Sequence, residues 1–173
     1  MKDLAGEFRA RKAAGDKVAA LTAYDYPTAR LVDEAGADII LVGDSLGMVV
    51  LGYPDTTSVT LDDMIRHTGA VARGVKHAVI VTDLPIDTYR TPDESVASAR
   101  RLVEAGAQAV KLEGGAAVAP QIRALVAAGI PVLAHIGMLP QHIREEGGYK
   151  IKGRTAEEAG TIRRDADAVQ EAG

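Results

Sequence analysis

The strongest constraint on the fold is a repeated junction in which a helical segment ends at glycine and a short apolar run follows. The junction reads DEAGADIILVGD at 33–44, EAGAQAVKLEGG at 104–115 and AAGIPVLAHIG at 127–137, and QEAG at 170–173 begins it again. Glycine supplies the left-handed conformation that closes a helix. Short apolar runs between helices are typical of parallel strands buried on both faces. The repeat therefore predicts a β/α architecture.

Three threonine-led sequences predict where helices begin. TLDD at 60–63 resembles a capping box, and TPDE at 91–94 and TAEE at 155–158 are complete ones. Together with the apolar pattern they predict helices near 3–14, 27–36, 61–73, 92–105, 116–128 and 156–172, and strands near 18–23, 38–44, 78–83, 108–113 and 131–135. The predicted order is a leading helix followed by five β/α units.

Two α/β folds fit this order, an open doubly wound sheet and a (β/α)₈ barrel. A nucleotide-binding doubly wound sheet needs a glycine-rich fingerprint after its first strand, whereas this strand is followed by YDYP at 24–27. The barrel is therefore favoured. Barrels take eight units and about 200 residues or more, and this chain has 173 residues. We predict one partial barrel domain over 1–173 that holds only the first five units, with an N-terminal helix at about 3–14.

Composition excludes several classes of protein. The net charge is −4, with no basic excess to attract nucleic-acid phosphates. No apolar run reaches the roughly 18 residues that span a bilayer, and the charged N-terminus does not resemble a signal peptide. Cysteine is absent, which excludes disulfides and thiolate chemistry. We expect a cytoplasmic protein that binds neither nucleic acid nor membrane.

Polar side chains stand at the carboxyl ends of the predicted strands. In a barrel these ends converge on one mouth, where active sites lie. Lys111 and Glu113 are two positions apart on one strand and therefore point to the same face. The candidate site residues are Asp44, Ser45, Asp83, Lys111, Glu113 and His135.

Three carboxylates in one pocket suggest a metal site. Asp44, Asp83 and Glu113 would repel one another unless a cation lay among them. Oxygen ligands favour a hard divalent ion, Mg²⁺ by preference. Such an ion chelates a 2-oxo acid and stabilises the enolate formed when an α-proton leaves. Lys111 would assist as an electrophile or orient the carbonyl.

Structural roles remain open for several of these residues. A strand-end Asp often caps the following helix, and His135 is equally compatible with a hydrogen-bonded core residue. His67 and His77 are expected at the surface, and the role of His142 is undecided. The glycine-rich basic stretch at 147–154 fits either a lid over an anionic substrate or a solvated loop.

The sequence resembles the ketopantoate hydroxymethyltransferase family over most of residues 18–155. The combination of GDSLGM, KLEGG and HIGMLPQ in this order is specific to it. The matching stretches are LTAYDYPTARL at 21–31, LVGDSLGMVVLGYPDTTSVTLDDMIRHT at 41–68, VTDLP at 81–85, AVKLEGG at 109–115, IPVLAHIGMLPQ at 130–141 and GGYKIKGRT at 147–155. The resemblance implies a (β/α)₈ barrel of the phosphoenolpyruvate mutase/isocitrate lyase type.

The resemblance also implies an activity. The family transfers a hydroxymethyl group from 5,10-methylenetetrahydrofolate to 3-methyl-2-oxobutanoate, through a Mg-stabilised enolate, and forms 2-dehydropantoate in pantothenate biosynthesis. Its enzymes are cytoplasmic homo-oligomers, often decamers. The implied metal ligands are Asp44, Asp83 and Glu113, the substrate-binding residues Asp44, Ser45, Asp83 and Lys111, and the catalytic residues Lys111 and His135.

One element of the family pattern has no counterpart here. The family's proton acceptor is a Glu on strand 6, which would follow Gly173. We therefore expect a C-terminally truncated copy whose own activity is uncertain. One alternative is a non-catalytic or split-enzyme fragment that binds only metal and ketoacid. Another is a related C–C lyase, but those enzymes carry a Cys-containing loop and this chain has no Cys.

Overall fold

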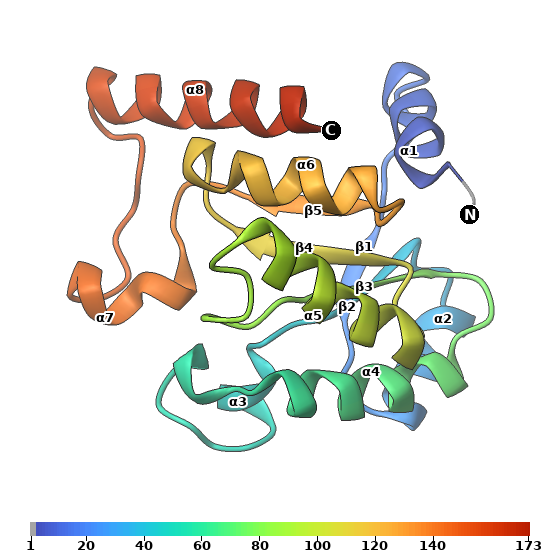
Figure 1. The fold of residues 1–173 in the computed structure, drawn as a ribbon. Coiled ribbons are helices and arrows are strands. Elements are labelled where there is room, and N and C mark those ends of the chain that lie inside the picture. Colours follow the sequence, from blue (N-terminus) through green and yellow to red (C-terminus); the bar gives the residue numbers. More distant parts are fainter. Residues whose placement is uncertain (1–2) are drawn as a thin grey trace.

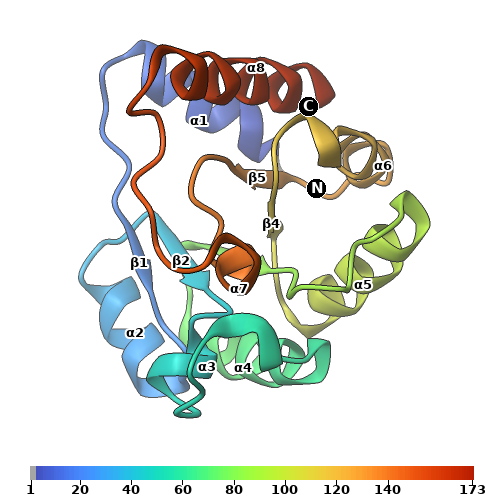
Figure 2. The same cartoon turned by 90° about the vertical axis from the view of Figure 1, so that its left-hand side faces the viewer.

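The computed structural model describes residues 3–173 as a parallel five-stranded sheet in the order β1-β2-β3-β4-β5. The strands are β1 (Ala20–Thr22), β2 (Ile39–Val42), β3 (Val79–Asp83), β4 (Ala109–Glu113) and β5 (Val132–His135). Helices surround the curved sheet, and α7 lies beyond one end of it, in front of the strands in Figure 2 (Figures 1 and 2). This arrangement confirms the predicted partial barrel of five β/α units. Residues 1 and 2 of the predicted domain lie outside the described residues.

Six longer helices match the sequence prediction to within a few residues. They are α1 (Leu4–Ala13), α2 (Tyr26–Glu34), α4 (Leu61–Gly74), α5 (Pro92–Ala105), α6 (Ala119–Ala127) and α8 (Ala156–Ala172). No helix within residues 3–173 is long and apolar enough to cross a membrane.

Short helical turns were not predicted separately, because one turn is too short to show helical periodicity. They are α3 (Leu46–Val49), α7 (Ile143–Glu146), and the 3₁₀ turns η1 (Thr56–Ser58), η2 (Ala116–Val118) and η3 (Pro140–His142). The turn η2 occupies the start of the helix predicted at 116–128. The others lie in the loops that follow β2 and β5, where the candidate site is built.

The predicted capping boxes form before α4 and α8 but not in full before α5. Thr91 accepts the backbone N–H of Glu94, as expected. The Glu94 carboxylate, however, accepts the N–H of Arg90 rather than that of Thr91. Gly36 and Gly106 adopt φ of 86° and 117° where α2 and α5 end, so the predicted left-handed helix termini are confirmed.

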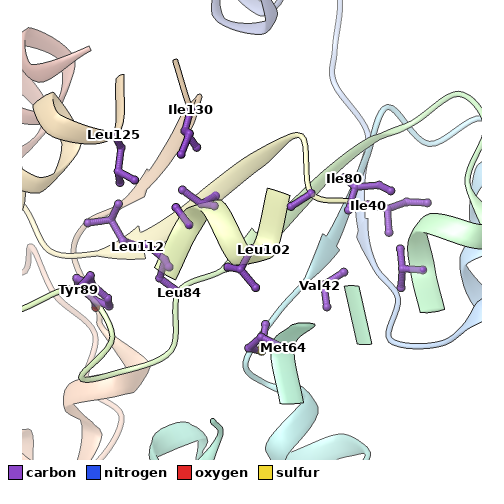
Figure 3. Packing of buried hydrophobic residues seen from close by; sticks show 14 of the residues in the cluster. Ile40, Val42, Met64, Ile80, Leu84, Tyr89, Leu102, Leu112, Leu125 and Ile130 are labelled. Carbon is purple, nitrogen blue, oxygen red and sulfur yellow. The ribbon is translucent and has the colours of Figure 1, made fainter. Parts of the chain in front are cut away.

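The core lies between the outer face of the sheet and the helices (Figure 3). Val110 and Leu112 of β4 are fully buried there, as the alternation along the strand predicts. The opposite, inner face of the strands is apolar at their amino ends. There Val79, Val81 and Ala109 line a cavity of about 440 Å³ that α1 and Gly173 also border.

The sequence predicts that β5, the apolar strand that follows the helix end at Gly129, is buried on both faces. This prediction is wrong. Leu133 of β5 retains 44% of its exposed area, and Leu21 of β1 retains 54%. The two strands are the edges of the described sheet. Leu133 lies opposite Lys111 on the inner face and Leu21 lies opposite Ile40 on the outer face, so each edge strand leaves a side chain uncovered on a different face.

Asp33 ties α2 to the segment that enters β3. It is buried, and its carboxylate accepts the backbone N–H groups of Lys76, His77 and Ala78 at 2.9, 3.0 and 2.7 Å. We expect Asp33→Ala to lower the free energy of unfolding by about 2–4 kcal/mol, because these donors lose a charged acceptor. Urea denaturation measures it. Glu34→Ala, which alters only an exposed neighbour, is the control, expected within about 0.5 kcal/mol of the parent. Equal effects of the two variants would contradict the anchoring role.

Candidate active site

The register of the sheet brings the predicted polar residues together in pairs. Asp83 of β3 lies opposite Lys111 of β4, and Glu113 of β4 lies opposite His135 of β5. Opposite residues of parallel strands share a face, so all four lie on the inner face at the carboxyl ends. This is the mouth at which barrel active sites are built.

Asp83 accepts two hydrogen bonds that fix its carboxylate. Lys111 Nζ lies 2.7 Å from its Oδ1, and the backbone N–H of Asp44 donates to its Oδ2 at 3.0 Å. Gly43 lies beside this contact: a Cβ there would be 2.9 Å from Ser45 Oγ and 3.5 Å from Asp83 Oδ2. Asp83 therefore joins β2, β3 and β4 and does not cap a helix.

Glu113 is buried, and both of its carboxylate oxygens have partners. His135 Nδ1 lies 3.1 Å from Oε1, and the backbone N–H of Gln141 donates to Oε2 at 3.0 Å. His135 is half-buried beside it. The histidine therefore belongs to the polar network of the site, and its contact with Glu113 orients its ring.

Asp44 follows β2 and is buried at 4% exposure. Its Oδ2 accepts a hydrogen bond from Gln141 Nε2 at 2.8 Å. Burial, and next the nearby Asp83 carboxylate, raise the pKa of Asp44 to about 7, although Gln141 and Lys111 lower it in part. Burial also raises the pKa of Asp83, and the Lys111 ammonium offsets part of that rise. The site thus holds two neighbouring buried carboxylates whose ionised forms are disfavoured by burial.

The donor set fits a hydrated divalent cation. Within residues 3–173 no three His, Asp or Glu side chains are arranged to ligate one ion together. Asp44, Asp83 and Glu113 are instead linked through Lys111 and Gln141. Mg²⁺ usually keeps several waters and binds through one or two carboxylates. Two neighbouring buried carboxylates whose pKa values are raised have the chemistry that such an ion relieves.

Ser45 lies at the start of α3, beside Asp44. Its Oγ is 2.9 Å from the hydroxyl of Tyr24, and His67 Nδ1 contacts the backbone oxygen of Tyr24. The surface position expected for His67 is therefore wrong, because the ring is half-buried against the loop after β1. His77 is exposed, as expected.

Two residues of the network were not identified from the sequence. Gln141 lies in η3, and Tyr89 lies in the loop before α5, with its hydroxyl 2.5 Å from Gln141 Oε1. Gln141 belongs to the quoted stretch HIGMLPQ, but a polar residue in a loop carries no periodic signal. Only the folded loop shows that it is buried against two carboxylates.

Comparison with known sequences identifies the family. The sequence model of ketopantoate hydroxymethyltransferase matches residues 4–173. The chain belongs to this family. It is 56% identical over 160 residues to the 3-methyl-2-oxobutanoate hydroxymethyltransferase of Ignicoccus hospitalis, covering 92% of this chain and 61% of that protein. It is 53% identical to the enzyme of the same name from Clostridium novyi, covering 100% of this chain and 64% of that one.

The chain thus spans about three fifths of the length of the curated relatives it matches. Solved structures with the same fold include phosphonopyruvate hydrolase in complex with oxalate and Mg²⁺ (TM-score 0.73, 18% identity, covering 97% of this chain and 59% of that chain). Another is 2,3-dimethylmalate lyase, described as a member of the PEP mutase/isocitrate lyase superfamily (TM-score 0.69, 20% identity, 100% and 62%). At these sequence identities the structural similarity shows the fold alone. It confirms that this member of the ketopantoate hydroxymethyltransferase family has the predicted fold of the phosphoenolpyruvate mutase/isocitrate lyase type.

Proposed function

We propose that this chain carries the metal- and oxo-acid-binding part of a 3-methyl-2-oxobutanoate hydroxymethyltransferase. The reaction transfers a hydroxymethyl group from 5,10-methylenetetrahydrofolate to 3-methyl-2-oxobutanoate and yields 2-dehydropantoate. The observation that carries the proposal is the convergence of Asp44, Asp83, Lys111 and Glu113 at the carboxyl ends of neighbouring strands. The names of relatives about 55% identical support the reaction.

Asp44 and Asp83 are the residues that would hold Mg²⁺ directly, and Glu113, whose two oxygens are both engaged, would act on it through a bound water. When bound, the ion supplies a Lewis acid for the charge that develops on the keto oxygen. Lys111 keeps its ammonium on the inner face, 2.7 Å from Asp83. From there the ammonium orients the substrate carbonyl and stabilises negative charge on its oxygen. The Ser45 hydroxyl, held by Tyr24, is a hydrogen-bonding group for the substrate.

Removal of the proton from C3 of the oxo acid needs a basic group that is free to accept it. Two of the carboxylates of the site are already occupied by hydrogen bonds. Both oxygens of Asp83 accept hydrogen bonds, and so do both oxygens of Glu113. His135 Nδ1 faces Glu113. Within the part of the chain that the structure describes, Asp44 keeps one free oxygen, Oδ1, but that oxygen is the one available to the cation. We infer that these residues bind and orient the substrate and that the proton is taken by a group outside the set.

Calorimetric titration with Mg²⁺ and 3-methyl-2-oxobutanoate tests the site. We expect Asp44→Ala and Asp83→Ala to abolish measurable binding of the pair, because each removes a buried anionic oxygen donor. Asp62→Ala is the matched control, since Asp62 is an exposed carboxylate on α4 paired with Arg101. Parent-like binding by both site variants would refute the proposed metal and substrate residues.

Hydrogen exchange in the oxo acid tests the assignment of the base. In deuterated buffer with Mg²⁺, we expect the C3 proton of 3-methyl-2-oxobutanoate to exchange no faster with the chain than without it. Proton NMR of the substrate follows the loss of signal. Rapid exchange that disappears in a site variant would show that the chain holds a working base, which the contacts of Asp83 and Glu113 do not predict.

Two properties of the whole protein are proposed from family membership. We propose a cytoplasmic location and a homo-oligomeric assembly, with small molecules as the ligands. Sedimentation velocity of the purified chain measures the assembly.

A further inference from the structure

Gln141 contacts two of the predicted site carboxylates. It is 2% exposed, although it lies in the short turn η3 of a loop. Its Nε2 donates to Asp44 Oδ2 at 2.8 Å and to the backbone oxygen of Leu84 at 3.0 Å. Its backbone N–H donates to Glu113 Oε2 at 3.0 Å. One residue therefore connects two carboxylates that lie on different strands or their loops.

Tyr89 determines which way the Gln141 amide points. Its hydroxyl donates to Gln141 Oε1 at 2.5 Å and also lies 3.4 Å from the backbone oxygen of Glu113. Burial raises the pKa of Tyr89, so the phenol keeps its proton. A flipped amide would turn Oε1 toward Asp44 and Leu84, which offer only acceptor oxygens. The amide is thus held with its NH₂ group facing Asp44.

As a result, the two oxygens of the Asp44 carboxylate differ in their hydrogen bonding. Within residues 3–173, Oδ1 of Asp44 accepts no hydrogen bond, whereas both oxygens of Asp83 and of Glu113 do. Because Gln141 occupies Oδ2, Oδ1 is the oxygen left for a ligand. A cation can bind there without displacing a hydrogen bond of the protein, whereas at the other two carboxylates it must displace one.

We propose that Gln141 is a positioning residue, oriented by Tyr89, that holds Asp44 with Oδ1 free to bind a divalent cation. The inference rests on the proposed function, because the cation is the Mg²⁺ of that site. Groups that orient metal-binding side chains typically change metal affinity about 10–100-fold when they are removed. Gln141 is a candidate for such a role because its side chain contacts Asp44 directly.

The test is the Mg²⁺ dissociation constant of the metal-free chain and its variants, measured by calorimetry. We expect Gln141→Ala to weaken binding about 10-fold or more and Tyr89→Phe to weaken it less. The double variant should bind Mg²⁺ no more weakly than Gln141→Ala alone, because Tyr89 is proposed to act on the site only by orienting Gln141. Tyr89→Phe keeps the buried ring, so it carries the test if Gln141→Ala does not fold.

Gln121→Ala separates positioning from general loosening of the loops. Gln121 is also a buried glutamine, and its Nε2 donates to the backbone oxygens of Tyr89 and Arg90 but to no carboxylate. We expect it to lower the melting temperature and leave the Mg²⁺ dissociation constant unchanged. An equal loss of affinity in Gln121→Ala, or none in Gln141→Ala and Tyr89→Phe, would overturn the positioning role alone. A parent chain that binds no Mg²⁺ would overturn the proposed metal site together with it.

Discussion

Lys111→Met is expected to lower the free energy of unfolding by about 3–5 kcal/mol, because it leaves the buried Asp83 carboxylate without its ion-pair partner. The side chains of Lys111 and Asp83 are 13% and 3% exposed, and the two groups are 2.7 Å apart. The methionine retains most of the aliphatic packing, so the loss reports the charge. Urea denaturation of the metal-free chain at neutral pH measures it.

A double variant distinguishes an unpaired charge from poor packing. Asp83→Asn in combination with Lys111→Met removes both charges, and we expect it to recover most of the lost stability. Both variants should nevertheless fail to bind 3-methyl-2-oxobutanoate, because the ammonium on the inner face is gone. A loss below about 1 kcal/mol in Lys111→Met would show that the contact behaves like an exposed ion pair, and the site would then be more hydrated than its burial indicates.

The polar residues on the strands of the site could be predicted from the sequence, because side chains along a strand alternate between its two faces. The two-residue spacing of Lys111 and Glu113 fixes their common face, and sequential parallel pairing places Asp83 and His135 beside them. The apolar run of β5 alone indicates burial on both faces, but five β/α units cannot close a barrel, and Leu133 accordingly remains half-exposed at an edge.

The site residues that lie in loops could not be predicted from sequence patterns. Gln141 and Tyr89 are 52 positions apart and meet only because the loops after β3 and β5 fold over the same end of the sheet. Neither residue type is distinctive in a loop, and η3 is too short for a helical pattern. A polar network of this kind depends on tertiary contacts, whereas the carboxylates it orients can be located from strand ends.

The pH dependence of stability is the second large effect, and it arises chiefly from Asp44, with Asp83, whose pKa burial also raises, adding in the same direction. The Asp44 pKa of about 7 lies above the ordinary value of 3.8, chiefly because of burial and then of Asp83. Between these two values the folded chain holds a proton that the unfolded chain releases, so the free energy of unfolding falls as the pH rises between them and levels off above about 7. The difference corresponds to at most about 4 kcal/mol.

Thermal unfolding of the metal-free chain between about pH 5 and pH 8 measures this effect. We expect the melting temperature to fall across the range in the parent and to change much less in Asp44→Asn, which cannot ionise. Carboxylates with lowered pKa values, such as Asp55 at about 2, are already ionised throughout the range and add no slope. Asp62→Asn, an exposed change, should keep the parent's slope.

Asp44→Asn should also be more stable than the parent at pH 8, because the amide removes a buried charge beside Asp83. Added Mg²⁺ is expected to stabilise the parent at pH 8 and to leave Asp44→Asn unchanged, since the ion binds the ionised carboxylate. A parent whose stability does not vary with pH, or an Asp44→Asn chain that Mg²⁺ stabilises equally, would contradict this role. Ionised Asp44 thus lowers the stability of the metal-free chain at pH 8, and a bound cation would offset part of that loss.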